Sequence, residues 1–375
     1  MFLSSSPTVK GSSGYHASKT GKSPIIDKLG QTYSIKSFCW TKRRDQSISL
    51  KHVYLLDGFQ IIWCLLLSLL NGRFNAVVTT GIPVLESVPT FVIAKLLRIP
   101  IIMKETHWYW PKTNVSTFTW PINKLMVSNA DLVICPGKRA FEYWRSLGIA
   151  ENKITVVPFY SSELERNTQS EKTELELDSI FENKIVILCF GRLIKKKGID
   201  YLVNAFAPIQ KEFRNVVLVI AGDGPERQSL QQLCDRLELS NVIFTGAPQE
   251  NVKSAYFSSS DIYVYPSITL ELPEEWPLGV VEAMSIGKPV IVTTATGSAP
   301  DVVKQGINGY KVPEKDAAAL YKALRRLITD KNLRTAMGVA SQKIAKEAFS
   351  YDSAVEAFDK AIKATTVMPS KTSKK

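Results

Sequence analysis

Two glutamates, Glu274 and Glu282, stand eight positions apart and flank a short turn that ends in Gly279. The pattern after the turn predicts a helix, and a helix N-terminus presents free backbone N–H groups to an anion. A carboxylate just inside such a helix can accept hydrogen bonds from ribose hydroxyls, as acidic side chains do in other nucleotide sites. On spacing alone, two solvated glutamates beside a loop explain the segment equally well.

A basic loop follows the apolar run Ile185–Phe190 and extends from Gly191 to Gly198. Doubly wound sheets bind ligands at the carboxyl ends of their strands. Arg192 and Lys197 can therefore neutralise a pyrophosphate there, Arg through its planar fork and Lys as a point charge. A solvated charged loop is the alternative, and it is the commoner explanation for three consecutive lysines. The glycine-rich turn Ala221–Glu226 is expected to be mainly structural.

Strand and helix patterns alternate through most of the second half. Five short apolar runs predict strands: Ile185–Phe190, Val216–Ala221, Val242–Thr245, Ile262–Tyr265 and Pro289–Thr293. Because these runs are apolar throughout rather than alternating, both faces of each strand are covered, which predicts a parallel sheet between helix layers. We therefore expect a doubly wound α/β domain.

The first half repeats this pattern less regularly. A first strand is expected at Phe2–Ser6, and a last helix of the chain at Ser353–Lys363. Between them we expect the strands Asn75–Thr80, Pro100–Lys104, Asp131–Cys135 and Lys153–Val157 and the helix Leu85–Leu97. The polar, acidic stretch Ser161–Asp178 is expected to link two domains, 1–165 and 166–348, as the length of 375 residues favours.

Charge is unevenly distributed along the chain. The net charge is +12, and residues 1–160 hold 19 Lys and Arg against 8 Asp and Glu. Such asymmetry is typical of a domain that meets an anionic partner, a membrane surface or nucleic acid, although a solvated basic surface without a partner explains it as well. The basic half contains no recognisable nucleic-acid-binding module, so we expect no nucleic-acid partner.

Cysteines, histidines and apolar runs limit the class of protein further. Five scattered cysteines without a Cys-x-x-Cys pair are expected to be reduced thiols, and three separated histidines do not predict a metal site. We expect no signal peptide, because the N-terminus lacks a charged region followed by an apolar run. Ile61–Leu70 is shorter than the roughly 20 residues of a membrane-spanning helix, so a buried or interfacial helix is expected. A cytoplasmic protein, free or peripheral on the inner face of the cell membrane, is the resulting expectation.

The basic loop, the glycine turn and the Glu…Glu loop stand at the ends of successive predicted strands. With Ala283-Met284 and Gly287-Lys288-Pro289-Val290 behind them, the run from Ile185 to about Phe349 resembles the donor-binding domain of family-4 retaining glycosyltransferases. The resemblance implies an α/β GT-B architecture, with two Rossmann-like doubly wound domains across a cleft. It also implies that residues 349–375 contain a helix that crosses back to the first domain, followed by a frayed tail.

The resemblance also implies residue roles. Arg192 and Lys197 would hold the donor diphosphate, Glu282 the ribose and Glu274 the hydroxyls of the transferred sugar. His107, just after the predicted strand Pro100–Lys104, would face the transferred sugar, although an ordinary packed or solvated histidine is the alternative. The other implied donor-binding positions are loop backbone groups: Gly191, Leu278 and Gly279. The implied acceptor-side positions are two glycines and one aromatic residue: Gly11, Gly14 and Trp108. The two glycines lie in a loose counterpart of the family's glycine-rich loop after the first strand.

The reaction implied is transfer of a sugar from a nucleotide-diphosphate donor to an acceptor hydroxyl with retention of configuration, without a metal or other cofactor. The basic first half and Ile61–Leu70 suit docking on anionic lipid, so a lipid-linked or cell-surface glycan is the expected acceptor. Two alternatives stay open. One is a nucleotide-sugar epimerase or sugar phosphorylase of the same fold, and the other is a non-catalytic nucleotide-sugar-binding subunit.

Overall fold

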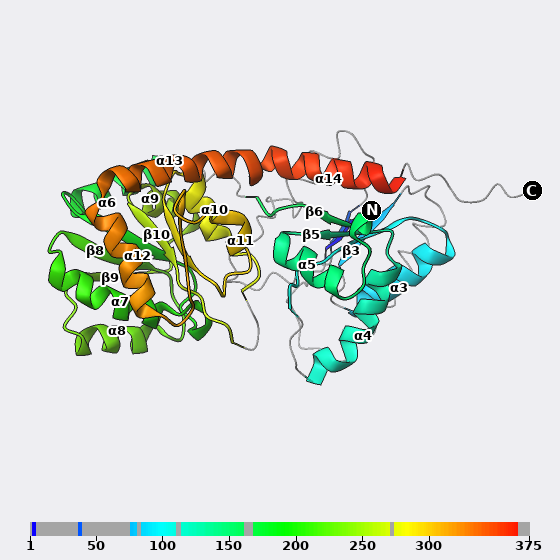
Figure 1. Cartoon of the computed structure of the whole chain (residues 1–375), viewed down its shortest axis with the longest axis horizontal. Helices are drawn as coiled ribbons and strands as arrows, with labels where there is room; N and C mark the ends of the chain where they lie inside the picture. The colour runs from blue at the N-terminus through cyan, green and yellow to red at the C-terminus, as the bar shows by residue number, and fades with distance from the viewer. Residues whose placement is uncertain are drawn as a thin grey trace, which may run out of the picture. The chain divides into compact units, whose positions relative to one another are not determined.

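The computed structural model describes residues 2–4, 37–39, 76–80, 84–109, 114–160, 168–270 and 274–366. The chain divides into two compact units, Met1–Pro158 with Ala354–Lys375, and Phe159–Ser353. Each unit contains its own six-stranded sheet, and the strand pairs are parallel (Figure 1). The predicted α/β fold class is therefore confirmed.

The sheet of the second unit has the strand order β12-β11-β10-β7-β8-β9. Its strands are β7 (Ile185–Phe190), β8 (Val216–Ala221), β9 (Val242–Gly246), β10 (Ile262–Tyr265), β11 (Val290–Thr293) and β12 (Gly309–Val312). The five predicted strands match β7 to β11 within one residue, whereas β12 has no predicted counterpart. The chain runs outward from β7 to β9 and then returns to β10 on the other side of β7. The strand order thus reverses between β7 and β10, which is where doubly wound sheets bind ligands.

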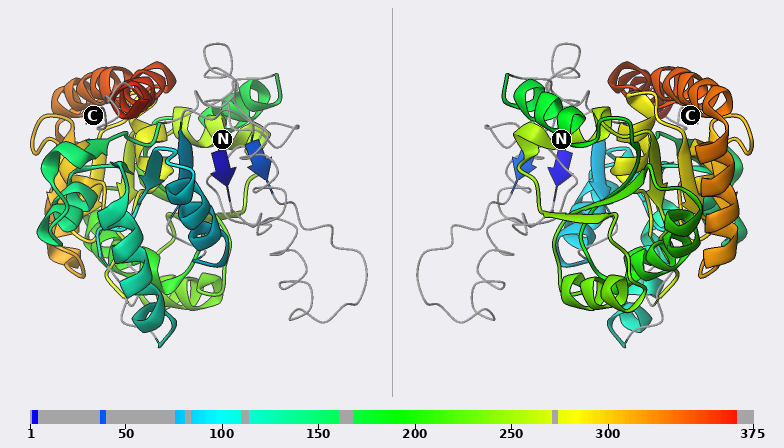
Figure 2. Two further views of the ribbon diagram at one scale, coloured as in Figure 1. Left: turned by 90° about the vertical axis from the view of Figure 1, so that its right-hand side faces the viewer. Right: turned by 90° about the vertical axis from the view of Figure 1, so that its left-hand side faces the viewer.

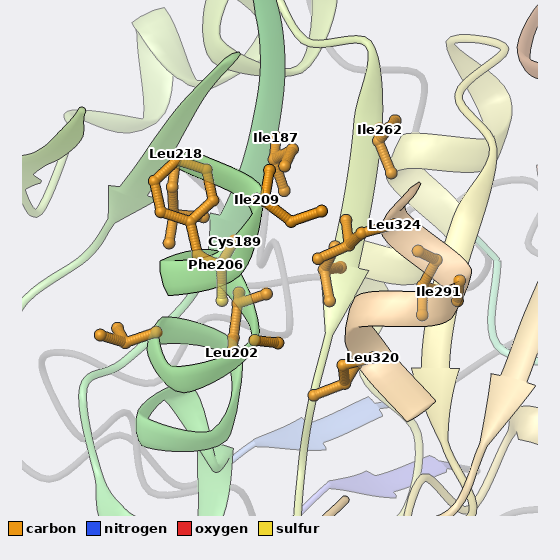
Figure 3. Packing of buried hydrophobic residues seen from close by; sticks show 14 of the residues in the cluster. Ile187, Cys189, Leu202, Phe206, Ile209, Leu218, Ile262, Ile291, Leu320 and Leu324 are labelled. Atoms are coloured by element: carbon orange, nitrogen blue, oxygen red, sulfur yellow. The ribbon is translucent and has the colours of Figure 1, made fainter. Parts of the chain in front are cut away.

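Helices cover both faces of this sheet (Figure 2). One face carries α7 (Ile199–Glu212), α8 (Arg227–Arg236) and α12 (Ala317–Thr329), and the other carries α9 (Lys253–Ser258), α10 (Leu278–Ser285) and α11 (Ala299–Val302). Ile187, Phe206 and Leu324 meet in the first core (Figure 3). Because neighbouring strand residues point to opposite faces, Leu188 packs in the second core. Residues of α13 (Lys331–Ala348) contribute to both cores.

The prediction of a linker over Ser161–Asp178 is wrong in part, because Thr168–Ile180 forms helix α6. Leu177 in the helix and Phe181 just after it are buried in the second core. The helix lies against α9. The acidic composition of this segment therefore belongs to the solvent side of a helix that packs on the second unit.

The sheet of the first unit has the order β2-β1-β3-β4-β5-β6. Its strands are β1 (Phe2–Ser4), β2 (Ser37–Cys39), β3 (Val77–Thr80), β4 (Ile101–Lys104), β5 (Leu132–Cys135) and β6 (Ile154–Val156). Its helices are α3 (Val84–Leu96), α4 (Asn114–Asn129) and α5 (Lys138–Ser146). The strands and the helix predicted for the first half are confirmed. The candidate loop Gly11–Gly14 and the apolar run Ile61–Leu70 lie outside the described residues.

The last helix, α14 (Tyr351–Thr366), completes the first unit. Phe358 and Ile362 on this helix pack with Ile102 of β4 and Ile134 of β5. One face of the first sheet is thereby covered by a helix from the far end of the chain. No helix in the described part of the chain is long and apolar enough to cross a membrane.

Candidate active site

The glycine-rich turn after β8 fixes the backbone of the basic loop after β7. A Cβ on Gly222 would lie 1.8 Å from the carbonyl oxygen of Gly191, and one on Gly224 would lie 2.3 Å from that of Leu193. The N–H of Leu193 donates to the carbonyl of Asp223 at 2.9 Å. Only glycine allows this approach, so the turn has the structural role expected for it and holds the loop at the point of strand reversal.

Lys197 and Glu274 meet at this point of the sheet. Lys197 Nζ lies 2.9 Å from Oε2 of Glu274, and Lys196 Nζ lies 3.4 Å from the same oxygen. Lys197 also donates to the hydroxyl of Tyr265, the last residue of β10. The side chains of Lys197 and Glu274 are only 16% and 13% exposed. Two residues placed at different strand ends by the sequence are thus in direct contact.

The charge of Glu274 follows from these contacts. Burial raises the pKa of this carboxyl, but the ammonium groups of Lys197 and Lys196 outweigh burial and leave the pKa below its ordinary value. Its backbone is also fixed, because the N–H of Gly297 donates to the Glu274 carbonyl at 2.8 Å. Glu274 is therefore an ionised acceptor held at a fixed position at neutral pH.

Glu282 and the first turn of α10 form the second part of the site. Leu278 and Gly279 begin the helix, and a Cβ on Gly279 would lie 2.5 Å from the Tyr263 hydroxyl. Glu282 is 6% exposed and pairs with Lys253 of α9, with Nζ and Oε1 2.6 Å apart. Sequence reasoning did not identify Lys253, because its helix shows no motif. Because a Cβ at position 279 would collide with the Tyr263 hydroxyl, only glycine allows the first turn of α10 to lie this close to β10.

Arg192 is exposed in the basic loop, five positions before Lys197. All the donor-binding residues that the sequence predicts lie in the second unit: Gly191, Arg192, Lys197, Glu274, Leu278, Gly279 and Glu282. Within the described ranges, no group of three or more His, Cys, Asp and Glu side chains could hold a metal ion. The arrangement offers cations and helix N–H groups to an anion and two carboxylates to hydroxyl groups.

His107 and Trp108 belong to the first unit and follow β4. His107 Nδ1 lies 3.6 Å from Oε2 of Glu105, a carboxylate that is 1% exposed. Asn123 of α4 donates to the same oxygen at 3.5 Å. Arg139 lies 4.6 Å from the centre of the Trp108 ring, a cation–π contact. Sequence reasoning missed Glu105, although its place after a buried strand, two residues before His107, was an available signal.

Comparison with known proteins shows what the second unit is similar to. Residues 171–344 match the model of glycosyl transferases group 1. An uncharacterized glycosyltransferase of Methanocaldococcus jannaschii is 25% identical over 64% of this chain and 60% of its own length. The GDP-mannose-dependent alpha-(1-6)-phosphatidylinositol monomannoside mannosyltransferase of Mycolicibacterium smegmatis is 34% identical over 42% of each chain. The chain spans about half the length of the curated relatives it matches.

A solved structure matches over almost the whole chain. HepE of Anabaena, crystallised with UDP and glucose, has a TM-score of 0.71 and 19% identity, and the match covers 97% of this chain and 98% of HepE. At this identity the likeness concerns the fold, which is GT-B, as the sequence predicts. Residues 171–344 are thus similar to the glycosyl transferases group 1 family.

Proposed function

We propose that the protein is a retaining glycosyltransferase of family 4 that moves a sugar from a nucleotide-diphosphate donor to an acceptor hydroxyl. The Lys197–Glu274 contact at the strand reversal carries the proposal, because it brings together a cation, which can bind a phosphate, and a carboxylate, which can accept hydrogen bonds from sugar hydroxyls. The family match over 171–344 includes both residues. The name of the mannosyltransferase relative and the UDP in the HepE crystals support a nucleotide-sugar donor.

The proposed chemistry is mainly electrostatic. Arg192, Lys197 and the N–H groups of Leu278 and Gly279 stabilise the charge that grows on the leaving diphosphate. Because these groups supply the positive charge, we propose that neither a metal nor an organic cofactor takes part. Glu274 accepts hydrogen bonds from the transferred sugar.

Retention follows from attack on the face that the diphosphate leaves. The bond between the anomeric carbon and the phosphate oxygen breaks, and the acceptor oxygen bonds to that carbon. The acceptor's proton passes to a phosphate oxygen of the leaving group, so no covalent enzyme intermediate is required. His107 is proposed to hydrogen-bond the transferred sugar, and Trp108 to contact the acceptor.

For the acceptor we propose a glycan, lipid-linked or at the cell surface, reached by a cytoplasmic enzyme peripheral on the membrane. Leu96 on α3 and Phe118 and Leu125 on α4 are 77%, 78% and 65% exposed. Lys95 and Lys124 lie on the same helices. Apolar side chains beside lysines are the composition that binds anionic membrane surfaces.

A donor panel tests the proposal. UDP-, GDP-, ADP- and dTDP-sugars are screened by thermal shift against the wild type, Arg192→Ala and Glu274→Ala. Donors that bind are then incubated with and without acceptor. The proposal predicts that one donor stabilises the wild type more than either variant and that the sugar moves only when acceptor is present. Conversion of the donor without acceptor would indicate an epimerase instead, and donor binding without any turnover would indicate a non-catalytic subunit.

A further inference from the structure

Lys253 forms an ion pair with Glu282 and has no part in the chemistry described above. Lys253 begins α9, whereas Glu282 lies in α10, and the two are 29 positions apart. Nζ and Oε1 are separated by 2.6 Å, and each side chain is 8% exposed. The ring of Phe190 lies 5.5 Å from the same ammonium group. The exposed carboxylate of Glu250 also lies 3.5 Å from that ammonium. The Lys253–Glu282 pair is therefore largely buried, with one further charge at its edge.

A buried ion pair of this kind is not an efficient way to stabilise a fold. Removing two charges from water is costly, and apolar side chains of similar volume often serve as well or better. The neighbours Ala255 and Phe257 on α9 are buried in the second core, so an apolar side chain at 253 would suit its surroundings. The charges at Lys253 and Glu282 thus call for a role other than packing.

The orientation of Glu282 indicates that role. Lys253 occupies Oε1, while Oε2 lies 3.8 Å from the position of a Cβ on Gly279, in the first turn of α10. A carboxylate has about four acceptor positions, so an ion pair with lysine leaves capacity for hydroxyl donors. Hydrogen bonds to a charged acceptor are about twice as strong as those to a neutral one.

We propose that Lys253 is a positioning residue that holds the Glu282 carboxylate in place, and thereby makes the site selective for nucleotides with free ribose hydroxyls. This inference rests on the proposed function and on the role that the family resemblance implies for Glu282, which is to bind the donor ribose. Lys253 acts through Glu282 and does not contact the reacting atoms. The selectivity is lost when the carboxylate loses its cation, because the ion pair no longer fixes its orientation toward the ribose and the remaining buried charge is costly.

The test compares two ligands of the same base, a nucleoside diphosphate and its 2′,3′-dideoxy form, by isothermal titration calorimetry. UDP and GDP are both used, since the base is not fixed by the argument. The wild type is expected to prefer the ribose form about tenfold or more, and Lys253→Met to lose most of this preference. Glu250→Gln is the matched control, because Glu250 is the exposed carboxylate 3.5 Å from the same ammonium, and it is expected to keep the preference.

Two more variants separate positioning from folding. In a Glu282→Gln background, Lys253→Met is expected to change either affinity less than about twofold, because its effect passes through Glu282. If Lys253→Met fails to fold by circular dichroism, Lys253→Gln replaces it and is expected to reduce the preference several-fold. A folded Lys253 variant with the wild-type preference would overturn the role of Lys253 alone. A wild type that binds none of the four nucleoside diphosphates of the donor panel would overturn the proposed function as well.

Discussion

Lys197 and Glu274 are 77 positions apart in the sequence, yet their side chains form an ion pair of 2.9 Å where the strand order of the second sheet reverses. Each is proposed to bind one part of the donor, and the ion pair holds both side chains in place. A phosphate that competes for Lys197 would free an oxygen of Glu274 for a sugar hydroxyl. The pair therefore couples recognition of the two parts of the proposed donor.

Lys197→Ala is expected to lower the rate of sugar transfer by about 10²–10³-fold, because it removes a cation at the developing charge of the leaving group. Lys195→Ala is the matched control. Lys195 lies two positions away in the same loop, but it is 56% exposed and pairs with Asp200, and such exposed pairs contribute little to stability. Equal rates for the two variants in a transfer assay would contradict the assigned role.

The lowered pKa of Glu274 predicts how stability depends on pH. A carboxyl whose pKa is lower in the folded state stabilises the protein fully above the ordinary pKa of about 4.3. That contribution is lost as the pH falls through the lowered pKa. The free energy of unfolding of the wild type should therefore fall toward that of Glu274→Gln below about pH 4. Urea titrations from pH 3 to 7 check this, and a gap that widens on acidification would refute it.

Gly279→Ala is expected to lower the free energy of unfolding by about 1–3 kcal/mol, as overpacking does, because the added Cβ would meet the Tyr263 hydroxyl at 2.5 Å. The double variant with Tyr263→Phe removes that hydroxyl and should recover part of the loss. Denaturant titration of the single and double variants measures the recovery. A double variant no more stable than Gly279→Ala would show that the clash has another cause.

Glu105 and His107, which both belong to the first unit of the chain, are expected to depend on each other in sugar transfer. Glu105→Gln and His107→Ala should each slow transfer, and the double variant should be no slower than His107→Ala, because the carboxylate acts through the imidazole. Glu142→Gln, which removes an exposed carboxylate of α5, serves as the control. Additive losses in the double variant would indicate that the two side chains act independently.

The membrane proposal predicts that the wild type sediments with anionic vesicles at low salt. Replacing Phe118 and Leu125 by serine should weaken this binding without lowering thermal stability, because both side chains are largely exposed. A wild type without preference for anionic over neutral vesicles would contradict a peripheral location.

Sequence patterns were sufficient to predict the position of a site residue where that residue follows the end of a strand. Lys197 and Glu274 come after apolar runs that correspond to β7 and β10, and parallel strands bring their carboxyl ends to one edge. Glu105 also follows a strand, β4, so its position was predictable in the same way although its burial was not. Lys253 was not identifiable from a strand end, because it begins the short helix α9. The burial of Lys253 depends on how α9 and α10 pack, which local composition does not predict.

The same distinction holds for the elements. Strand β12 contains Gly309 and Lys311 and is only four residues long, so its apolar signal is weak. Helix α6 was hidden by its acidic side chains, because Leu177 alone is buried among the residues 171–180 whose exposure is described. Long apolar runs such as β7 and β8 were recognisable because both of their faces are covered.

A crystal structure of the complex with the nucleoside diphosphate that stabilises the protein tests the central claim most directly. The account predicts a phosphate oxygen within about 3 Å of Lys197 Nζ, with Arg192 also at the diphosphate and a ribose hydroxyl on Glu282. A diphosphate bound away from the carboxyl ends of β7 and β10, with the Lys197–Glu274 pair unchanged, would contradict it.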